Sequence, residues 1–258
     1  MDLVRRYARR DFRARSGVRS GDELEALGSS LEKMADDLAA SEAEIAKRTR
    51  TETNLRRYLP AEAAEAAANG DDGALDLGGA KRRVTVVFAD VVAFTSFAEK
   101  TSPERAVAFL NELFTILSEV VFRHEGMVDK FIGDCIMAVF RGDDHATRAL
   151  AAAEDMHAFV SSNLPRWREA YAFDVELGIG VATGDVLLGN LGSETRMEYT
   201  VIGDAVNVAA RLEAIARPRQ TLATREVKEA CPEHRFTSLG SHELRGRAQS
   251  VEVFEVVT

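Results

Sequence analysis

The sequence predicts an α+β domain that follows an elongated helical segment, and three observations lead to this prediction. From residue 84 onward, short apolar runs alternate with longer amphipathic stretches, as strands alternate with helices in a layered domain. Two of the apolar runs end on an aspartate, Asp90 and Asp134. Nearer the N-terminus, apolar residues recur at alternating spacings of three and four, which is typical of a helix that packs against another helix.

The composition allows one substantial core and an extension. The chain has 258 residues, of which 46% are hydrophobic and 29% are charged. Its formal net charge of -9 argues against non-specific binding to nucleic acid, so no nucleic-acid partner is expected. Cys135 and Cys231 are the only cysteines and suggest neither a disulfide framework nor a Cys/His metal site, so we expect a reducing, cytoplasmic environment.

The start of the sequence bears on membrane attachment. No run of about 18 apolar residues is present, so we expect no segment of this sequence to span a bilayer. Arginines crowd residues 5–15, either as the cytoplasmic flank of a membrane helix or as a solvated helix, and the sequence leaves both interpretations open. The expectation is therefore a cytoplasmic protein or the cytoplasmic part of a membrane-anchored receptor, with membrane contact only through an upstream segment.

Residues 1–59 are expected to form an elongated helical segment. Ser20 to Glu23 supply a helix start, and the apolar seam that follows predicts a parallel coiled coil or helical bundle. The seam consists of Leu24, Leu27, Leu31, Met34 and Leu38. Residues 60–81 are expected to form a short helix and a linker, because Pro60 ends or restarts the helix and several glycines follow.

The predicted domain occupies residues 82–258 and begins with a strand, a helix and a hairpin. The strand is Val84–Asp90, and the helix is Pro103–His124, whose apolar residues share one face. Two short strands follow, Met127–Phe131 and Ile136–Phe140, joined by a hairpin at Ile132–Asp134.

The second half of the domain repeats this alternation. A strong turn dipeptide, Gly184-Asp185, predicts a hairpin between strands Val175–Thr183 and Val186–Leu191. The remaining expected elements are a helix over Asp143–Asn163, a helix over Asp204–Ala216, and a smaller α/β tail that ends in the strand Val251–Val257. The order βαββαβ predicts a ferredoxin-like fold, which does not by itself specify a function.

Asp90 and Asp134 would lie at the rim of this sheet, on strands that could be neighbours. A pair of carboxylates suits Mg²⁺, whose sites for nucleoside triphosphates are completed by phosphate oxygens. Either aspartate alone would be interpreted as an acid in a turn. The residues around them favour the metal site.

Three long motifs occur in order along the chain. They are F-A-D-V-V-A-F-T, D-K-F-I-G-D-C-I-M-A-V-F and E-Y-T-V-I-G-D-A-V-N-V-A-A-R-L-E, the last running from Glu198 to Glu213. Together they resemble the catalytic domain of class III nucleotidyl cyclases, and most nearly the bacterial homodimeric adenylyl cyclases, over about residues 82–257. Residues 21–38 resemble the second helix of a HAMP signal-relay module, with a generic dimerising helix as the alternative.

The resemblance implies an adenylyl cyclase in signal transduction. The ribose 3′-hydroxyl of ATP would attack the α-phosphate, and the products would be 3′,5′-cyclic AMP and pyrophosphate. Asp90 and Asp134 match the family's ligands for two Mg²⁺ or Mn²⁺ ions per site. The backbone near Phe94 and Thr95 would approach the triphosphate, although Ala93 stands where many relatives have glycine.

The residues Lys130 and Thr200 match the positions that choose the base in adenylyl cyclases. A lysine only donates hydrogen bonds, which suits the acceptor nitrogen N1 of adenine. Guanylyl cyclases tend to have Glu and Cys at these two positions, so Lys and Thr indicate ATP.

Asn207 and Arg211 match the remaining catalytic pair. They are four residues apart on a predicted helix and therefore share a face. Asn207 would orient the ribose, and Arg211 would stabilise the charge that builds on the α-phosphate. A further cation that contacts the phosphates could be Arg245 or Arg247, and the spacing decides for neither.

The resemblance also implies a homodimer with two shared sites. One protomer would supply Asp90 and Asp134, and its partner would supply Lys130, Thr200, Asn207 and Arg211. Two alternatives remain: a guanylyl cyclase, which Lys130 and Thr200 disfavour, and a catalytically inactive cyclase-like module for dimerisation or signal relay, which the complete set of motif residues disfavours.

Overall fold

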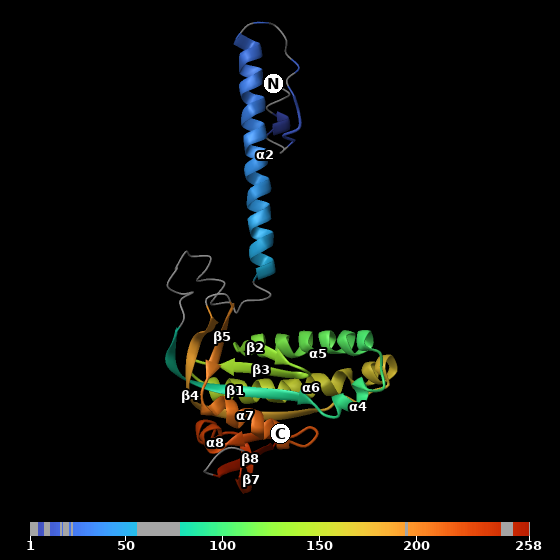
Figure 1. Cartoon of the computed structure of the whole chain (residues 1–258), viewed down its shortest axis with the longest axis vertical. Helices are drawn as coiled ribbons and strands as arrows, with labels where there is room; N and C mark the ends of the chain where they lie inside the picture. The colour runs from blue at the N-terminus through green and yellow to red at the C-terminus, as the bar shows by residue number, and fades with distance from the viewer. Residues whose placement is uncertain are drawn as a thin grey trace. The chain divides into compact units, whose positions relative to one another are not determined.

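The computed structural model describes residues 5–7, 11–15, 17, 21, 23–55, 78–193, 196–243 and 250–257. The chain divides into two compact units, an N-terminal unit within residues 1–71 and a C-terminal unit within residues 72–258 (Figure 1). Most of the predicted linker, and with it the predicted helix after Pro60, lies outside the described residues. No described helix is both long and apolar enough to cross a membrane.

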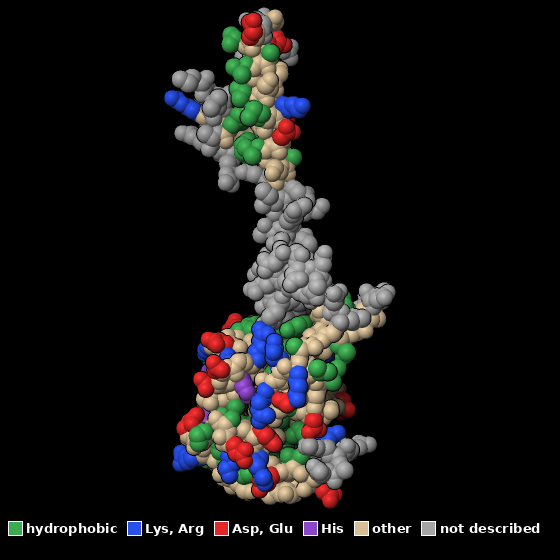
Figure 2. All heavy atoms as spheres, turned by 90° about the vertical axis from the view of Figure 1, so that its left-hand side faces the viewer, with side chains coloured by type: hydrophobic (Ala, Val, Ile, Leu, Met, Phe, Trp, Pro, Cys, Tyr) green, Lys and Arg blue, Asp and Glu red, His purple; other side chains and the backbone are tan. Residues whose placement is uncertain are grey.

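The N-terminal unit contains one long helix, α2, from Glu23 to Leu55. Residues 11–15 are not helical, so the expectation of helix throughout residues 1–59 is wrong there. The chain turns instead, which buries Ala14 and places Arg15 within 2.9 Å of Asp36 on α2. Hydrophobic side chains lie one above another along the helix (Figure 2), and of the predicted seam Leu24, Leu27, Met34 and Leu38 are exposed in the single chain.

The C-terminal unit is built on an eight-stranded sheet, with strands in the order β2-β3-β1-β4-β6-β8-β7 and with β5 paired to β4. Its elements are β1 Gly78–Val91, α4 Phe94–Ala98, α5 Pro103–Arg123, β2 Met127–Ile132, β3 Cys135–Phe140, α6 His145–Tyr171, β4 Leu177–Ser193, β5 Arg196–Ile202, α7 Asp204–Ile215, β6 Thr221–Thr224, α8 Arg225–Ala230, β7 Arg235–His242 and β8 Val251–Val257.

The first four strands form the predicted ferredoxin-like core. Strand β3 lies between β1 and β2 and is antiparallel to both, and β4 is antiparallel to β1. With α5 after β1 and α6 after β3, this is the βαββαβ arrangement. The α+β fold is therefore confirmed, and the predicted final strand Val251–Val257 matches β8.

The alternation of side chains along β1 separates two apolar cores. Val87 and Ala89 belong to the core that holds α5 and α6, whereas Val86 and Phe88 belong to the core that holds α7. Helices accordingly cover both faces of the sheet (Figure 1). Because successive strand residues point to opposite faces, Asp90 belongs to the α7 face.

The predicted hairpin at Gly184-Asp185 is wrong. Strand β4 runs straight through these residues, with Gly184 opposite Val84 and Asp185 opposite Arg83 on β1. A Cβ at Gly184 would lie 3.1 Å from the Cβ of Ala205, so this glycine serves the close approach of α7 rather than a turn. The long partner strand β1 therefore outweighs the local turn signal, and the hairpin forms later, between β4 and β5.

The second long helix extends beyond its predicted end at Asn163. Helix α6 continues to Tyr171 and contains Pro165. The added turns bury the side chain of Trp167, which meets the ring of Phe109 edge-to-face at 5.7 Å between centroids. Burial of this large aromatic side chain stabilises the last turns of the helix and offsets the loss of the backbone hydrogen bond that Pro165 cannot make.

Candidate active site

The two motif aspartates meet at one end of the sheet. Asp90 lies near the end of β1, and Asp134 lies in the turn between β2 and β3, directly after Gly133, whose φ is +65°. Because β1 and β3 are paired, with Ala89 opposite Ile136, the strands bring both carboxylates together. Burial and the negative charge of Asp134 raise the pKa of Asp90 to about 6, and burial also raises the pKa of Asp134.

A third acid, Glu213, approaches the pair from α7. Burial, together with the charges of Asp90 and Asp134, raises the pKa of Glu213 to about 7. The helix can come this close because Gly180 on β4 has no side chain. A Cβ at this position would lie 2.3 Å from the backbone nitrogen of Glu213. Sequence reasoning missed Glu213, although it ends the third motif, two residues after Arg211.

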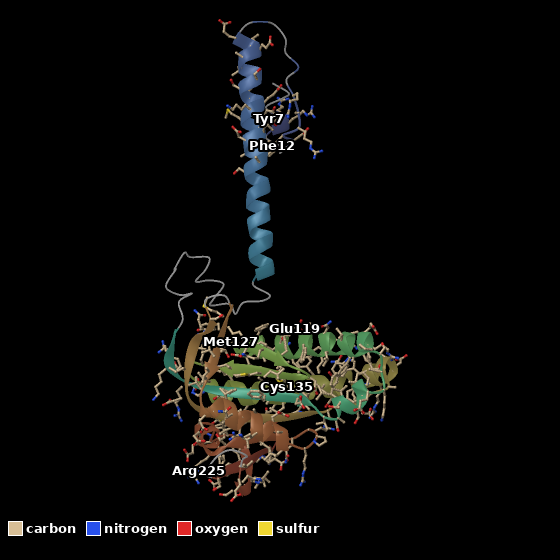
Figure 3. All side chains as sticks on the ribbon, viewed as in Figure 1. Tyr7, Phe12, Glu119, Met127, Cys135 and Arg225 are labelled. Carbon is tan, nitrogen blue, oxygen red and sulfur yellow. The ribbon has the colours of Figure 1, made fainter. Side chains whose placement is uncertain are left out.

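The donor set of the acid pair fits a hard cation. Mg²⁺ and Mn²⁺ prefer oxygen ligands such as carboxylates. A cation between the two carboxylates would also relieve the repulsion between their negative charges. Among the described residues no group of three or more His, Cys, Asp and Glu side chains is arranged to hold a metal, so a cation bound by Asp90 and Asp134 would need further ligands from substrate or water. Cys135, on β3 (Figure 3), is buried, and this burial raises the pKa of its thiol, so it is not a thiolate ligand.

Lys130 and Thr200 come together across β2 and β5. Between them lies Asp129, whose Oδ2 accepts a hydrogen bond of 2.9 Å from the Thr200 hydroxyl and lies 3.6 Å from Lys130 Nζ. Lys130 Nζ also donates to Glu198 Oε2 at 2.6 Å. Sequence reasoning identified Lys130 and Thr200 and missed the two acids that hold them.

The Asp129 carboxylate is buried in this cluster. Its side chain is 0% exposed, and Oδ1 has no hydrogen-bond partner among the described residues. Burial raises its pKa, while the hydrogen bond from Thr200, the charge of Lys130 and an interaction with the backbone of Val201 act in the opposite direction. The pairing of β2 with β3 shifts register between Val128 and Lys130, so Asp129 occupies a β-bulge.

Asn207 and Arg211 lie on α7, one turn apart. The opposite face of the helix is buried through Val208, Ala209 and Leu212, which leaves Asn207 exposed and Arg211 half-buried. Within the part of the chain that the structure describes, neither side chain has a hydrogen-bond or ion-pair partner. An unpaired, half-buried guanidinium is well suited to meet an anion.

Phe94 and Thr95 begin the short helix α4, which two residues separate from the strand that carries Asp90. The preceding residue, Ala93, has a φ of +61°, in the left-handed region that favours glycine. A glycine would adopt this conformation without strain, and Ala93 adopts it with only a methyl side chain. The candidate phosphate contacts Arg245 and Arg247 lie outside the described residues.

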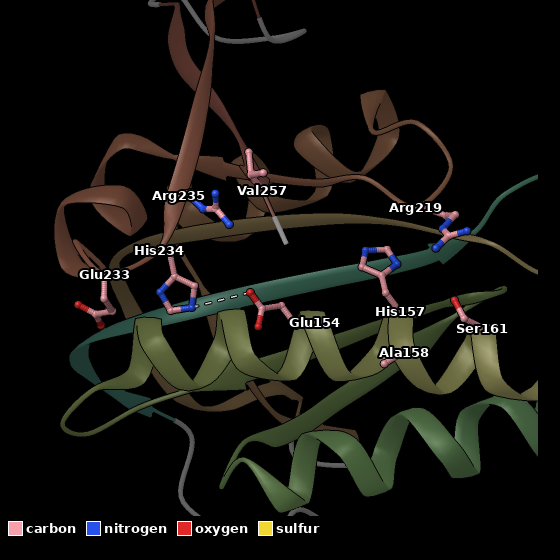
Figure 4. A pocket seen from close by; sticks show the side chains of 9 residues that line it. All are labelled: Glu154, His157, Ala158, Ser161, Arg219, Glu233, His234, Arg235 and Val257. Atoms are coloured by element: carbon pink, nitrogen blue, oxygen red, sulfur yellow. Dashed lines mark ion pairs between the residues drawn. The ribbon is translucent and has the colours of Figure 1, made fainter.

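The predicted site residues form separate groups within one chain. Among the described residues, no hydrogen bond or ion pair links the acid pair with Lys130, Thr200, Asn207 or Arg211. The pocket in Figure 4 does not link them either: it lies between α6 and the β7–β8 end of the sheet, and its lining includes His157, Arg219 and His234 but no predicted site residue.

The comparison with known families finds a match that covers most of the C-terminal unit. A model of the "Adenylate and Guanylate cyclase catalytic domain" matches residues 79–257.

Several curated proteins are similar in sequence. An adenylate cyclase of Rhizobium meliloti is 36% identical over 69% of this chain and 28% of its own length. An adenylate cyclase of Anabaena cylindrica is 30% identical over 98% of this chain and 52% of its own length. An uncharacterized protein of Mycobacterium tuberculosis is 35% identical over 98% of this chain and 45% of its own length. The chain thus spans about half, or less, of these relatives.

Solved structures of both kinds of cyclase are similar. The adenylyl cyclase CyaB from P. aeruginosa has a TM-score of 0.68 and 28% identity over 70% of this chain and 97% of its own. The guanylyl cyclase Cya2 has a TM-score of 0.65 and 31% identity over 70% of this chain and 94% of its own. Overall similarity therefore does not separate ATP from GTP as the substrate.

Proposed function

The chain belongs to the adenylate and guanylate cyclase catalytic-domain family, a class III nucleotidyl cyclase family, and we propose that it is an adenylyl cyclase. Its substrate would be ATP, and its products would be 3′,5′-cyclic AMP and pyrophosphate. The observation that carries the choice of ATP is the cluster of Lys130, Asp129 and Thr200, because overall similarity fits either nucleotide.

Asp90 and Asp134 would hold two Mg²⁺ or Mn²⁺ ions in each site. When bound, the ions would lower the pKa of the ribose 3′-hydroxyl and neutralise phosphate charge. The raised pKa of Asp90 supports this assignment, since a half-buried carboxylate beside a second carboxylate is unfavourable when charged until a cation lies between them. The two aspartates lie on a paired strand and a tight turn, so they can hold their positions without large rearrangement.

Arg211 and Asn207 would act on the nucleotide from the partner protomer. Arg211 would donate to the α-phosphate as negative charge builds there, and its lack of a partner among the described residues leaves its donors available. Asn207, exposed on the same helix face, would hold the ribose so that its 3′-hydroxyl is in line for attack. The backbone at Phe94 and Thr95 would lie along the triphosphate.

Lys130 would donate a hydrogen bond to N1 of adenine, and Thr200 would contact the neighbouring amino group. Guanine carries a proton at N1 and an acceptor oxygen beside it, so it presents the opposite pattern at both atoms. Lys130 has no acceptor to offer to guanine N1.

The proposed homodimer would account for an exposed apolar surface near Lys130 and Thr200. Large side chains that are exposed in the single chain occur at the β2 end and on the β4–β5 hairpin; they are Phe131, Ile132, Leu187, Leu191, Met197 and Ile202. Exposed apolar side chains gathered on two neighbouring hairpins are typical of a contact surface. A two-fold dimer that covers them would bring the acid pair of one protomer to the Arg211 of its partner, twice.

The N-terminal unit would be the input side of a signalling protein. The exposed seam on α2 suits a parallel helical dimer, and we propose that this dimer is a HAMP-like segment that couples an upstream sensor to the cyclase domain. The enzyme would then act in intracellular signal transduction, in the cytoplasm.

The test is product identification. The purified chain is incubated with equal concentrations of ATP and GTP and with Mn²⁺, and the cyclic nucleotides are separated by chromatography. We expect cyclic AMP to dominate, with the signal lost in Arg211→Ala. Cyclic GMP as the main product would contradict the proposed substrate, and the absence of any cyclic nucleotide from a folded dimer would contradict the proposed activity.

A further inference from the structure

We propose that Asp129 is a positioning residue that sets the base preference of this site by committing the proton of the Thr200 hydroxyl. The proposal rests on the cyclase activity proposed above and deepens it. A threonine hydroxyl can donate one hydrogen bond and can also accept, so Thr200 by itself suits an amino group as well as a carbonyl oxygen. The residue that binds its proton therefore decides which base it prefers.

The geometry assigns this proton to Asp129. The Thr200 hydroxyl donates to Asp129 Oδ2 at 2.9 Å, and Lys130 Nζ lies 3.6 Å from the same oxygen. An ionised carboxylate only accepts, so the hydroxyl oxygen can offer only its lone pairs to a ligand. An acceptor at this position suits the amino group of adenine and is repelled by the carbonyl oxygen of guanine.

The unfavourable burial of the Asp129 carboxylate indicates that this residue has a role beyond folding. Asp129 has 0% side-chain exposure, and its Oδ1 lacks a hydrogen-bond partner among the described residues. A buried carboxylate oxygen without a partner destabilises a fold and is rare without a functional reason. The bulge in β2 supplies the local means, because an extra residue at Asp129 changes the direction of its side chain and places it beside Thr200 on β5.

The test compares nucleotides rather than total activity. Asp129→Asn keeps the size of the side chain but lets its amide donate to Thr200, which frees the hydroxyl proton for the guanine oxygen. We expect the ratio of kcat/KM for ATP to kcat/KM for GTP to fall about fivefold to tenfold, the value of one hydrogen bond. A variant that is merely less well folded would lose activity with both nucleotides alike.

Variants of Thr200 provide matched controls. Thr200→Ser keeps the hydroxyl and should keep the parent ratio, whereas Thr200→Val removes it and should weaken ATP use without weakening GTP use. In the Thr200→Val background, Asp129→Asn should leave the ratio unchanged, because the proton that it would redirect is gone. Even if Asp129→Asn fails to fold, Thr200→Val tests the acceptor role that Asp129 would impose on the hydroxyl, because a hydroxyl free to donate would favour GTP and its removal would then weaken GTP use.

Binding separates this proposal from the proposed activity. Dissociation constants of non-cyclisable α,β-methylene ATP and GTP analogues are measured by calorimetry for the parent and each folded variant. If the parent forms no cyclic nucleotide, the proposed activity fails, and the analogue affinities still test the role of Asp129. An unchanged ratio in Asp129→Asn, or a Thr200→Val variant that loses GTP binding as much as ATP binding, would overturn the proposal.

Discussion

At the scale of single residues, the sequence predicts that Asp90 and Asp134 lie close together. Their place at the ends of apolar runs, with the flanking motifs, predicts that they meet, and the pairing of β1 with β3 brings them together. Asp129 and Glu213 were not predicted as site residues. Their significance depends on contacts between elements distant in sequence: Asp129 meets Thr200 across β2 and β5, and Glu213 reaches the acid pair only because Gly180 lets α7 approach β4.

The first prediction concerns the acid pair. Asp134→Asn should abolish most cyclase activity at saturating Mn²⁺, since a ligand charge is lost. The same change should stabilise the metal-free protein by up to about 1 kcal/mol, because it removes like-charge repulsion with Asp90, which adds to burial in raising the Asp90 pKa and is partly screened by solvent. That gain corresponds to a rise of about 2–4 °C in Tm.

Calorimetry without metal and product assays with metal check the two halves of this prediction. Asp143→Asn, at an exposed position outside the site, is the matched control and should change neither quantity. Activity of Asp134→Asn within a few-fold of the parent would contradict the metal assignment.

At the scale of elements, the predictions succeeded where hydrophobic periodicity is long and failed where a local signal competes with tertiary packing. Helix α5, predicted as Pro103–His124, spans Pro103–Arg123, with Ser102 as its N-cap. The hairpin predicted from Gly184-Asp185 does not form because β1 pairs with β4 over fourteen residues, and the helix predicted to end at Asn163 continues to Tyr171 because Trp167 is buried. Both failures share a cause, because the partner that decides the outcome lies far away in the sequence.

The second prediction concerns the contact between α6 and β6. His157 lies 3.0 Å from the Thr221 hydroxyl in the pocket of Figure 4, and burial, with the charge of Arg219, lowers its pKa to about 4. The unfolded state takes up a proton near pH 6.5, whereas the folded state does so only near pH 4. Stability contributed by neutral His157 is therefore present above pH 6.5 and is lost as the pH falls toward 4.

Denaturant titrations at pH 7.5 and pH 5 measure this effect. Between them, the parent should lose about 2 kcal/mol of unfolding free energy through His157, and His157→Gln, which does not titrate, should lose less by about that amount. Parallel losses in parent and variant would show that His157 is not held neutral by the fold.

At the scale of the whole molecule, the proposed active site requires two chains. The C-terminal unit exposes apolar side chains on the β2 and β4–β5 hairpins, and the N-terminal unit exposes its seam on α2. The α+β fold of the C-terminal unit could be predicted from the sequence, since periodicity and motifs specify it, whereas in the N-terminal unit the long helix was predicted and the turn at residues 11–15 was not. The dimer was predicted from the resemblance alone and stays a prediction, because a single chain shows only the surfaces that a partner would cover.

The third prediction tests the seam. Leu27→Asp with Met34→Asp places charges at positions that are 56% and 66% exposed in the single chain, so the protomer should stay folded. A helical dimer would be weakened, because the charges would be buried at its contact. We expect the sedimentation equilibrium to shift toward monomer and the specific activity to fall on dilution.

A matched variant carries the same charges off the seam. Ala26→Asp with Ser29→Asp alters exposed positions of the same helix and should leave association unchanged. Equal association constants for the seam variant and this control would exclude α2 as a dimer contact.

The most direct test of the shared site mixes two inactive variants. Asp90→Asn damages the metal half and Arg211→Ala the transition-state half, so each homodimer should be nearly inactive. In a heterodimer one site carries both lesions, and the other combines an intact Asp90 from one protomer with an intact Arg211 from its partner. With free exchange and random pairing, the mixture should recover on the order of one quarter of parent activity. If native mass spectrometry shows heterodimers while no activity returns, the catalytic groups do not come from two protomers.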